Sequence, residues 1–122
     1  MKLCVTTEEP DIHSLVSEDF GHSPFFLMYD TDTGSWEAFP NLAGESTVGI
    51  GIAAAEQVVA MSPDVVLTGH IGMHGTKKLQ SRNIRIVQDE EGTAEASIKR
   101  WIKKYGDTCR PAPTPARTAP PE

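Results

Sequence analysis

Three of the four histidines lie in short glycine-containing segments that could hold a ligand. His22 stands in the stretch FGHSP, while His70 and His74 stand in TGHIGMHG. Histidine is a common metal ligand, and it also carries a proton near neutral pH. Glycine allows the backbone itself to approach a ligand, because it has no side chain in the way. These two segments are therefore the first candidates for a binding site.

The spacing of His70 and His74 would place both imidazoles on one helix face if a helix already included His70. A metalloprotease helix needs a glutamate directly after its first histidine, and here Ile71 follows instead. We therefore do not expect a hydrolytic zinc site. On spacing alone, a polar connector with exposed imidazoles is the simpler explanation of the two histidines, so that alternative stays open.

The stretch STVGIGIAAAE, residues 46–56, resembles the glycine-rich turn of dinucleotide-binding proteins. That fingerprint must follow a strand directly and needs an acidic residue after the next strand, and both features are missing. We therefore exclude NAD binding. Thr47, Gly49 and Gly51 should still open a helix whose free N–H groups attract an anion. Packing of the helix against the sheet explains the glycines equally well.

The other reactive side chains do not predict catalysis. Cys4 falls in a predicted strand and should be a small buried residue, whereas Cys109 should be an exposed thiol. No serine has the G-x-S-x-G context of a nucleophile. A two-metal nuclease needs acids that converge from several strands. The acids of the first loop do not, and we interpret them as a solvated face: Glu8, Glu9, Asp11, Glu18 and Asp19.

Length and charge limit the class of protein. The 122 residues are enough for one domain with a real core. The formal net charge of −6 argues against nucleic-acid binding, which relies on Lys and Arg. No apolar run reaches the roughly 18 residues of a membrane span, and the N-terminus does not read as a signal peptide. We expect a cytoplasmic monomer with reduced cysteines and no nucleic-acid or membrane partner.

Hydrophobic periodicity predicts the order β-β-β-α-β-α-β-α. Strands are expected at residues 2–7, 24–30, 35–40, 64–69 and 84–87. Helices are expected on the stripe Val48, Ile52, Ala55 and Val59, then over 73–82 and 93–105. The first half makes hairpins and the second half right-handed crossovers. This predicts a mixed five-stranded α/β sheet with helices on both faces, and ligands beyond the carboxyl ends of its strands.

The C-terminal stretch GDTCRPAPTPARTAPPE differs from the rest in composition. It is rich in Pro, Ala and Thr and lacks large apolar residues, so it cannot bury enough surface to fold alone. We expect residues 1–105 to form the domain and residues 106–122 to form a disordered or polyproline-like tail. Such tails can dock on aromatic grooves, although a solvated tail is the simpler interpretation.

Two short motifs link the chain to a known family. They are F-G-x-x-P-x-F and T-G-x-I-G, formed here by Phe20, Gly21, Pro24, Phe26, Thr68, Gly69, Ile71 and Gly72. VGIGIAAAEQV lies between them, and LQSRNIRIV follows. In this order the motifs resemble the dinitrogenase iron–molybdenum cofactor biosynthesis family, which includes nitrogenase accessory proteins and the small orange protein. The resemblance covers about residues 1–104.

The resemblance implies a ribonuclease-H-like fold without nuclease acids and the binding of a metal–sulfur cluster. Family members hold iron–molybdenum–sulfur precursors, and the orange protein holds a molybdenum–copper sulfide cluster non-covalently. It also implies ligand contacts at His22 and His70, where members often carry histidine or arginine. The chain has no C-x-x-C motif, which agrees with a cluster that brings its own sulfide ligands.

A thiometallate cluster is a soft anion that suits helix N-terminal amides, imidazole N–H donors and apolar walls. The expected cofactor-binding residues are His22, Gly21, Thr47, Gly49, Ile50, Gly51, Thr68, Gly69, His70, Ile71, Gly72, Met73 and His74. Within this set, Ile50, Ile71 and Met73 should provide the walls. The expected function is a non-catalytic carrier of a cluster of molybdenum with copper or iron, which serves acceptor proteins. The alternative is a regulatory or protein-interaction module of the same fold.

Overall fold

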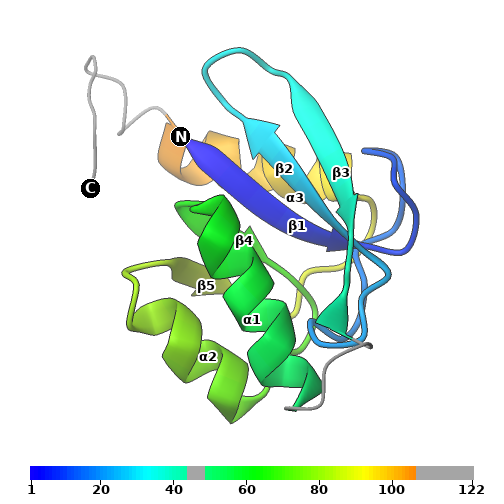
Figure 1. The fold of residues 1–122 in the computed structure, drawn as a ribbon. Helices are drawn as coiled ribbons and strands as arrows, with labels where there is room; N and C mark the ends of the chain where they lie inside the picture. The colour runs from blue at the N-terminus through cyan, green and yellow to red at the C-terminus, as the bar shows by residue number, and fades with distance from the viewer. Residues whose placement is uncertain (44–48, 107–122) are drawn as a thin grey trace.

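The computed structural model describes residues 1–43 and 49–106. The strands are β1 (Lys2–Thr7), β2 (Phe25–Asp30), β3 (Trp36–Pro40), β4 (Val65–Leu67) and β5 (Arg85–Val87). The helices are α1 (Ile50–Met61), α2 (Met73–Gln80) and α3 (Ala94–Trp101), and α3 continues into the π-helix η2 (Ile102–Gly106). The predicted element order is confirmed (Figure 1). Of the tail predicted at 106–122, Gly106 is the last residue of η2, and residues 107–122 lie outside the described residues, as do Thr47 and Val48.

The five strands form one mixed sheet in the order β3-β2-β1-β4-β5. β1 pairs antiparallel with β2 and parallel with β4, and β5 continues the parallel half. The carboxyl ends of β1, β4 and β5 therefore lie at the same end of the sheet. The first residue of β2 lies there too, because Phe25 pairs with Thr7. This is the predicted α/β fold, and it brings the segment before β2 beside the segment after β4.

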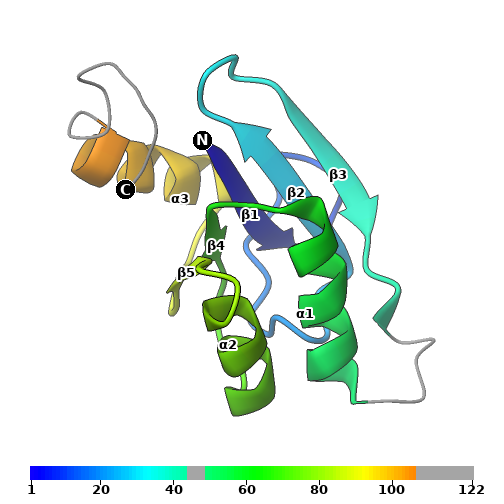
Figure 2. The same cartoon turned by 60° about the vertical axis from the view of Figure 1, so that its left-hand side comes forward.

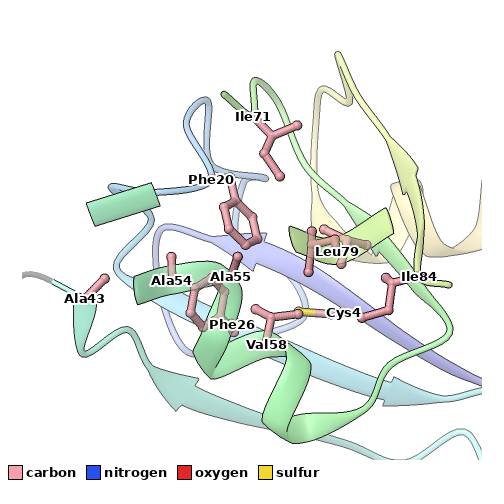
Figure 3. Close-up of a cluster of buried hydrophobic side chains, with 11 residues drawn as sticks. Cys4, Phe20, Phe26, Ala43, Ala54, Ala55, Val58, Ile71, Leu79 and Ile84 are labelled. Carbon is pink, nitrogen blue, oxygen red and sulfur yellow. The ribbon is translucent and has the colours of Figure 1, made fainter. Parts of the chain in front are cut away.

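The two faces of the sheet are covered by different helices (Figure 2). α1 and α2 pack over a cluster that includes Cys4, Phe26 and Val66. α3 packs over a cluster that includes Leu3 and Val5. Because successive strand residues point to opposite faces, β1 contributes to both clusters and is the central strand. Figure 3 shows the first cluster, in which Val58 and Leu79 meet Cys4.

The buried face of α1 differs from the predicted stripe. Ala54, Ala55 and Val58 are the buried residues of the helix, whereas Ile52 and Val59 are only half-buried. The prediction that Ala55 faces the core is confirmed, and Val48 lies outside the described residues. The small side chains at 54 and 55 let the helix axis lie close to the sheet, and close approach decides the buried face more than residue size does.

Cys4 is fully buried in the centre of the sheet. Burial raises the pKa of its thiol from 9.0 to about 12, because a thiolate would lose its hydration there. Cys4 is therefore a protonated, unreactive thiol at neutral pH, as the sequence indicated for a strand cysteine.

The raised pKa predicts a loss of stability in alkali. Above pH 9.0 the unfolded chain releases the Cys4 proton while the folded chain keeps it, so the free energy of unfolding falls as pH rises. The expected slope is about 1.4 kcal/mol per pH unit. Urea unfolding from about pH 9 to about pH 11 should show a loss of stability that approaches this slope in the wild type and is absent from Cys4→Val. Equal slopes in both proteins would contradict the assignment.

Candidate functional site

α1 and α2 begin without side-chain caps. Their N-cap residues are Gly49 and Gly72, neither makes a side-chain hydrogen bond, and neither helix has an acid in its first turn. α3 differs, because the Thr93 hydroxyl accepts a hydrogen bond from the Ala96 N–H at 3.1 Å and Glu95 lies in the first turn. Free N–H groups at a helix start carry partial positive charge. Within the described residues, two of the three α-helices thus have N-terminal N–H groups without a side-chain cap.

The two uncapped starts lie next to each other, at the lower end of Figure 1. A Cβ added to Gly75, in the first turn of α2, would lie only 3.6 Å from the carbonyl oxygen of Gly51 in α1. The same Cβ would lie 3.2 Å from the side chain of Ile71, which would have to shift, and in ordinary van der Waals contact with Gly51. Both helix dipoles therefore present their positive ends to one region.

That region has room beside the helix starts. A Cβ added to Gly51 or Gly72 would meet no atom within 4 Å. The segment before β2 borders the same region, because a Cβ on Gly21 would lie 3.2 Å from Ile50 and 3.5 Å from the Cα of Gly51. The FGHSP, VGIGI and TGHIG segments, far apart in sequence, thus meet at the carboxyl end of the sheet.

Residues 17–20 lie along residues 69–70, and backbone hydrogen bonds between the two segments fix the position of the loop after β4. The N–H of Gly69 donates to the Ser17 carbonyl at 3.1 Å, and the N–H of Phe20 donates to the His70 carbonyl at 2.8 Å. A Cβ on Gly69 would lie 2.5 Å from the carbonyl oxygen of Glu18, closer than real Cβ atoms come. Only glycine allows the two backbones to pack this closely.

His22 is held by Asp19 and is otherwise exposed. Its Nδ1 pairs with a carboxylate oxygen of Asp19, and 68% of its side chain is accessible. An Nδ1–H that donates to the carboxylate leaves Nε2 directed outward. This is the arrangement of metal-binding histidines, in which a carboxylate fixes the ring and the second nitrogen meets the metal. His22 can therefore bind a metal through Nε2 or, when protonated, donate a hydrogen bond to an anion.

Asp19 was not among the predicted site residues. The sequence analysis assigned it to a solvated acidic face, whereas the structure pairs it with His22 and with the N–H of Gly21 at 3.3 Å. The available signal was the spacing of Asp19 and His22, three residues apart on either side of a glycine. That spacing suits a tight turn in which a carboxylate meets an imidazole.

His70 and His74 do not share a helix face. α2 begins at Met73 after the N-cap Gly72, so His70 stays in the preceding loop while His74 lies in the first turn. Both histidines are exposed, and so is Met73 with 67% of its surface accessible. His70, Met73 and His74 thus surround the start of α2 with two imidazoles and a polarisable thioether.

The remaining predicted site residues divide into exposed and buried groups. Gly49 and Gly72 are exposed, and Gly21, Ile50 and Gly51 are partly exposed at the helix starts. Thr68, Gly69 and Ile71 are buried. The Thr68 hydroxyl is hydrogen-bonded to that of Thr6 at 2.8 Å, and Ile71 packs over Phe20 in the core (Figure 3). These buried residues support the site from beneath, and the apolar surface comes from Ile50 and Met73.

Two hollows in the described surface lie away from the helix starts. One, of about 260 Å³, is lined by Glu8, Glu9, Asp11, His13, Ser14 and Leu15. The other lies at the opposite end of β1. Within residues 1–43 and 49–106, no three His, Cys, Asp or Glu side chains converge to hold a metal ion. In the same part of the chain, no helix has the length and hydrophobicity that a membrane span requires.

The comparisons with known proteins agree with this fold. The model of the family described as "Dinitrogenase iron-molybdenum cofactor" matches residues 1–104. The apo form of the orange protein from Desulfovibrio gigas has a TM-score of 0.80 at 30% identity, over 84% of this chain and 88% of that protein. A putative NifB protein from Thermotoga shares the fold, with a TM-score of 0.72 at 20% identity over 84% and 87% of the two chains. Among proteins of curated function, none matches significantly.

The contact between Gly69 and Glu18 predicts a position that tolerates only glycine. Gly69→Ala should lower the free energy of unfolding by about 1–3 kcal/mol, because the new methyl group meets backbone that cannot turn away. Gly51→Ala is the matched control, since a Cβ there meets nothing and alanine favours a helix by about 1 kcal/mol. Urea unfolding should show opposite effects of the two changes, and equal stability of both variants would contradict the contact.

Proposed function

Because the chain belongs to the dinitrogenase iron-molybdenum cofactor family, we propose that it binds an anionic metal–sulfur cluster as a carrier that catalyses no reaction. One observation supports this most strongly. Two adjacent helices, α1 and α2, start at the same end of the sheet with no cap and no acid in their first turns. Helix starts of this kind bind anions through their N–H groups.

The residues around the helix starts suit a soft, polarisable anion. Free amides and imidazole N–H groups donate hydrogen bonds to negatively charged sulfide. Met73 and Ile50 add apolar and polarisable surface, which suits sulfide more than it suits water. His22, with its ring fixed by Asp19, adds either one metal ligand or one more donor. This set can hold a cluster that already carries its own sulfide ligands.

The charge of the protein sets a condition on this proposal. The chain carries a formal net charge of −6, and Glu18 and Asp19 lie near the site. The attraction must therefore come from short-range contacts with the helix starts and the histidines, since distant charges oppose an anion and are screened within about 10 Å in ordinary buffer. Binding that depends on short-range donors should change little with salt.

We propose molybdenum with copper or iron as the metals. The family description names iron and molybdenum, and the orange protein belongs among the similar structures. We also propose that the protein is a cytoplasmic monomer and that it passes its cluster to an acceptor protein. Its partners are thus the cluster and the acceptor, with no role for nucleic acid or membrane.

Anaerobic reconstitution tests the proposal. The purified protein is mixed with tetrathiomolybdate and copper(I), or with tetrathiomolybdate and iron(II), and then desalted. We expect a coloured protein in at least one mixture, because thiometallate clusters absorb visible light, with metal and protein eluting together. The measurements are the visible spectrum and the metal content of the protein fraction. A colourless protein without bound metal in both mixtures would contradict a carrier function.

Histidine variants test the location of the cluster. His22→Ala and His70→Ala should each weaken cluster binding about tenfold, since a charge-assisted hydrogen bond contributes about 1.5–3 kcal/mol. His13→Ala is the matched control, because His13 is exposed beside Glu95 at 3.5 Å, away from α1 and α2. Circular dichroism checks that each variant is folded. An equal loss in the control variant would move the binding site elsewhere.

A further inference from the structure

His22 is an exposed side chain on a turn whose neighbouring side chains are buried. Phe20 and Ser23 have 1% and 2% of their surface accessible, whereas 68% of the His22 side chain is accessible. The turn also contacts the start of α1, since a Cβ on Gly21 would lie 3.2 Å from the side chain of Ile50. The position of His22 relative to α1 therefore depends on what holds this turn.

The half-buried side chain of Asn41, directly after β3, bonds to the turn on both sides of His22. Its Nδ2 donates hydrogen bonds to the carbonyl oxygen of Gly21 at 3.1 Å and to that of Ser23 at 2.8 Å. Its Oδ1 accepts a hydrogen bond from the N–H of Ala43 at 2.8 Å. Only this orientation of the amide satisfies all three partners, because the two carbonyls accept and the N–H donates. The Asn41 amide is therefore fully used within the chain.

Gln57 of α1 holds the segment that carries Asn41. Its Nε2 donates a hydrogen bond to the carbonyl oxygen of Pro40 at 2.8 Å, and its Oε1 accepts one from the N–H of Leu42 at 2.9 Å. The next residue, Ala43, is buried in the core cluster beneath α1 (Figure 3). This segment is therefore bonded to α1 on both sides of Asn41, and it connects the helix to the turn.

Two sets of contacts thus hold the turn that carries His22. The Ser23 hydroxyl bonds to the carbonyl oxygens of Thr7 and Phe25, at 3.1 Å and 2.8 Å, and so fixes the end of the turn to β1 and β2. Asn41 adds the link to α1, and its two donated hydrogen bonds meet the backbone immediately before and after His22. The contact with the sheet explains the fold of the turn, whereas the contact with Asn41 sets its place beside the helix.

We propose that Asn41 is a positioning residue, which holds the turn so that His22 stands beside the uncapped start of α1. The imidazole and the free N–H groups of α1 then form one preformed set of donors. Preformed donors lose less conformational freedom when a ligand binds than donors on a mobile turn do. His22 serves the cluster in this way only if the chain binds one, so this consequence rests on the proposed function.

Nuclear spin relaxation in the full-length protein without a cluster tests the positioning directly. In the wild type, the ¹⁵N order parameter of the His22 amide should be about 0.85, the value of rigid backbone. Asn41→Ala removes all three hydrogen bonds of the side chain and should lower this order parameter below about 0.6, the range of flexible backbone. The amide of Ala96, in the first turn of α3, should keep its value and serves as the internal control.

A second variant keeps the test decisive if Asn41→Ala does not fold, which circular dichroism shows. Gln57→Ala frees the segment around Asn41, although Gln57 makes no hydrogen bond to residues 19–23. It should also lower the order parameter of the His22 amide, whereas the matched control Gln80→Ala, at the exposed end of α2, should leave it unchanged. An unchanged value in Asn41→Ala, or in Gln57→Ala where the first variant is unfolded, would overturn the proposal.

Cluster binding separates a positioning residue from a merely structural one. With the thiomolybdate–copper(I) mixture, Asn41→Ala should weaken binding by up to about tenfold, the loss expected on removing His22 itself. The same change made in the His22→Ala protein should cause no further loss. Equal losses in both backgrounds would show that Asn41 acts without His22, and would overturn the proposal. If the wild type takes up no cluster, the proposed function fails, while the relaxation result still decides whether Asn41 positions His22.

Discussion

The close contact between two backbone segments, residues 17–20 and residues 68–70, fixes the carboxyl end of the sheet. Gly69 allows it, because any side chain there would collide with the carbonyl of Glu18. Hydrogen bonds along the contact hold Phe20 beside His70, and Phe20 in turn packs under α1. The same contact leaves Asp19 and His22 at the surface beside the two helix starts. Packing and site geometry therefore depend on one pair of backbones.

The three α-helices of the described residues differ at their N-termini, because α3 has a side-chain cap and α1 and α2 do not. This difference bears on the proposed function. A side-chain cap stabilises a helix start over glycine by only a few tenths of a kcal/mol, and α3 has such a cap in Thr93. α1 and α2 have glycine at this position and forgo that stabilisation, although their buried faces hold them firmly on the sheet. Stability would favour Ser or Asp at Gly49 and Gly72, whereas an anion-binding site favours free N–H groups. The stabilisation is absent where the proposed cluster binds.

Hydrophobic periodicity was sufficient to predict the element order, the mixed sheet and the convergence of the three glycine segments. It was not sufficient for positions that depend on distance between elements. The buried face of α1 follows from how closely Ala54 and Ala55 let the helix approach the sheet. Thr68 is buried because Thr6 lies beside it on β1, a pairing that no local pattern reveals. Asp19 acquires its role only when the turn brings its carboxylate to His22.

Chemical-shift mapping tests most directly whether an anionic cluster binds between the starts of α1 and α2. A diamagnetic thiomolybdate–copper(I) mixture is titrated anaerobically into the ¹⁵N-labelled full-length protein. The largest shifts are expected at the amides of Gly51 and Met73 and at His22, whereas the capped start of α3 at Thr93 and Glu37 in the edge strand β3 should shift little. Shifts centred on Thr93 or Glu37, or no shifts at a large excess of the mixture, would contradict a cluster site at the uncapped helix starts.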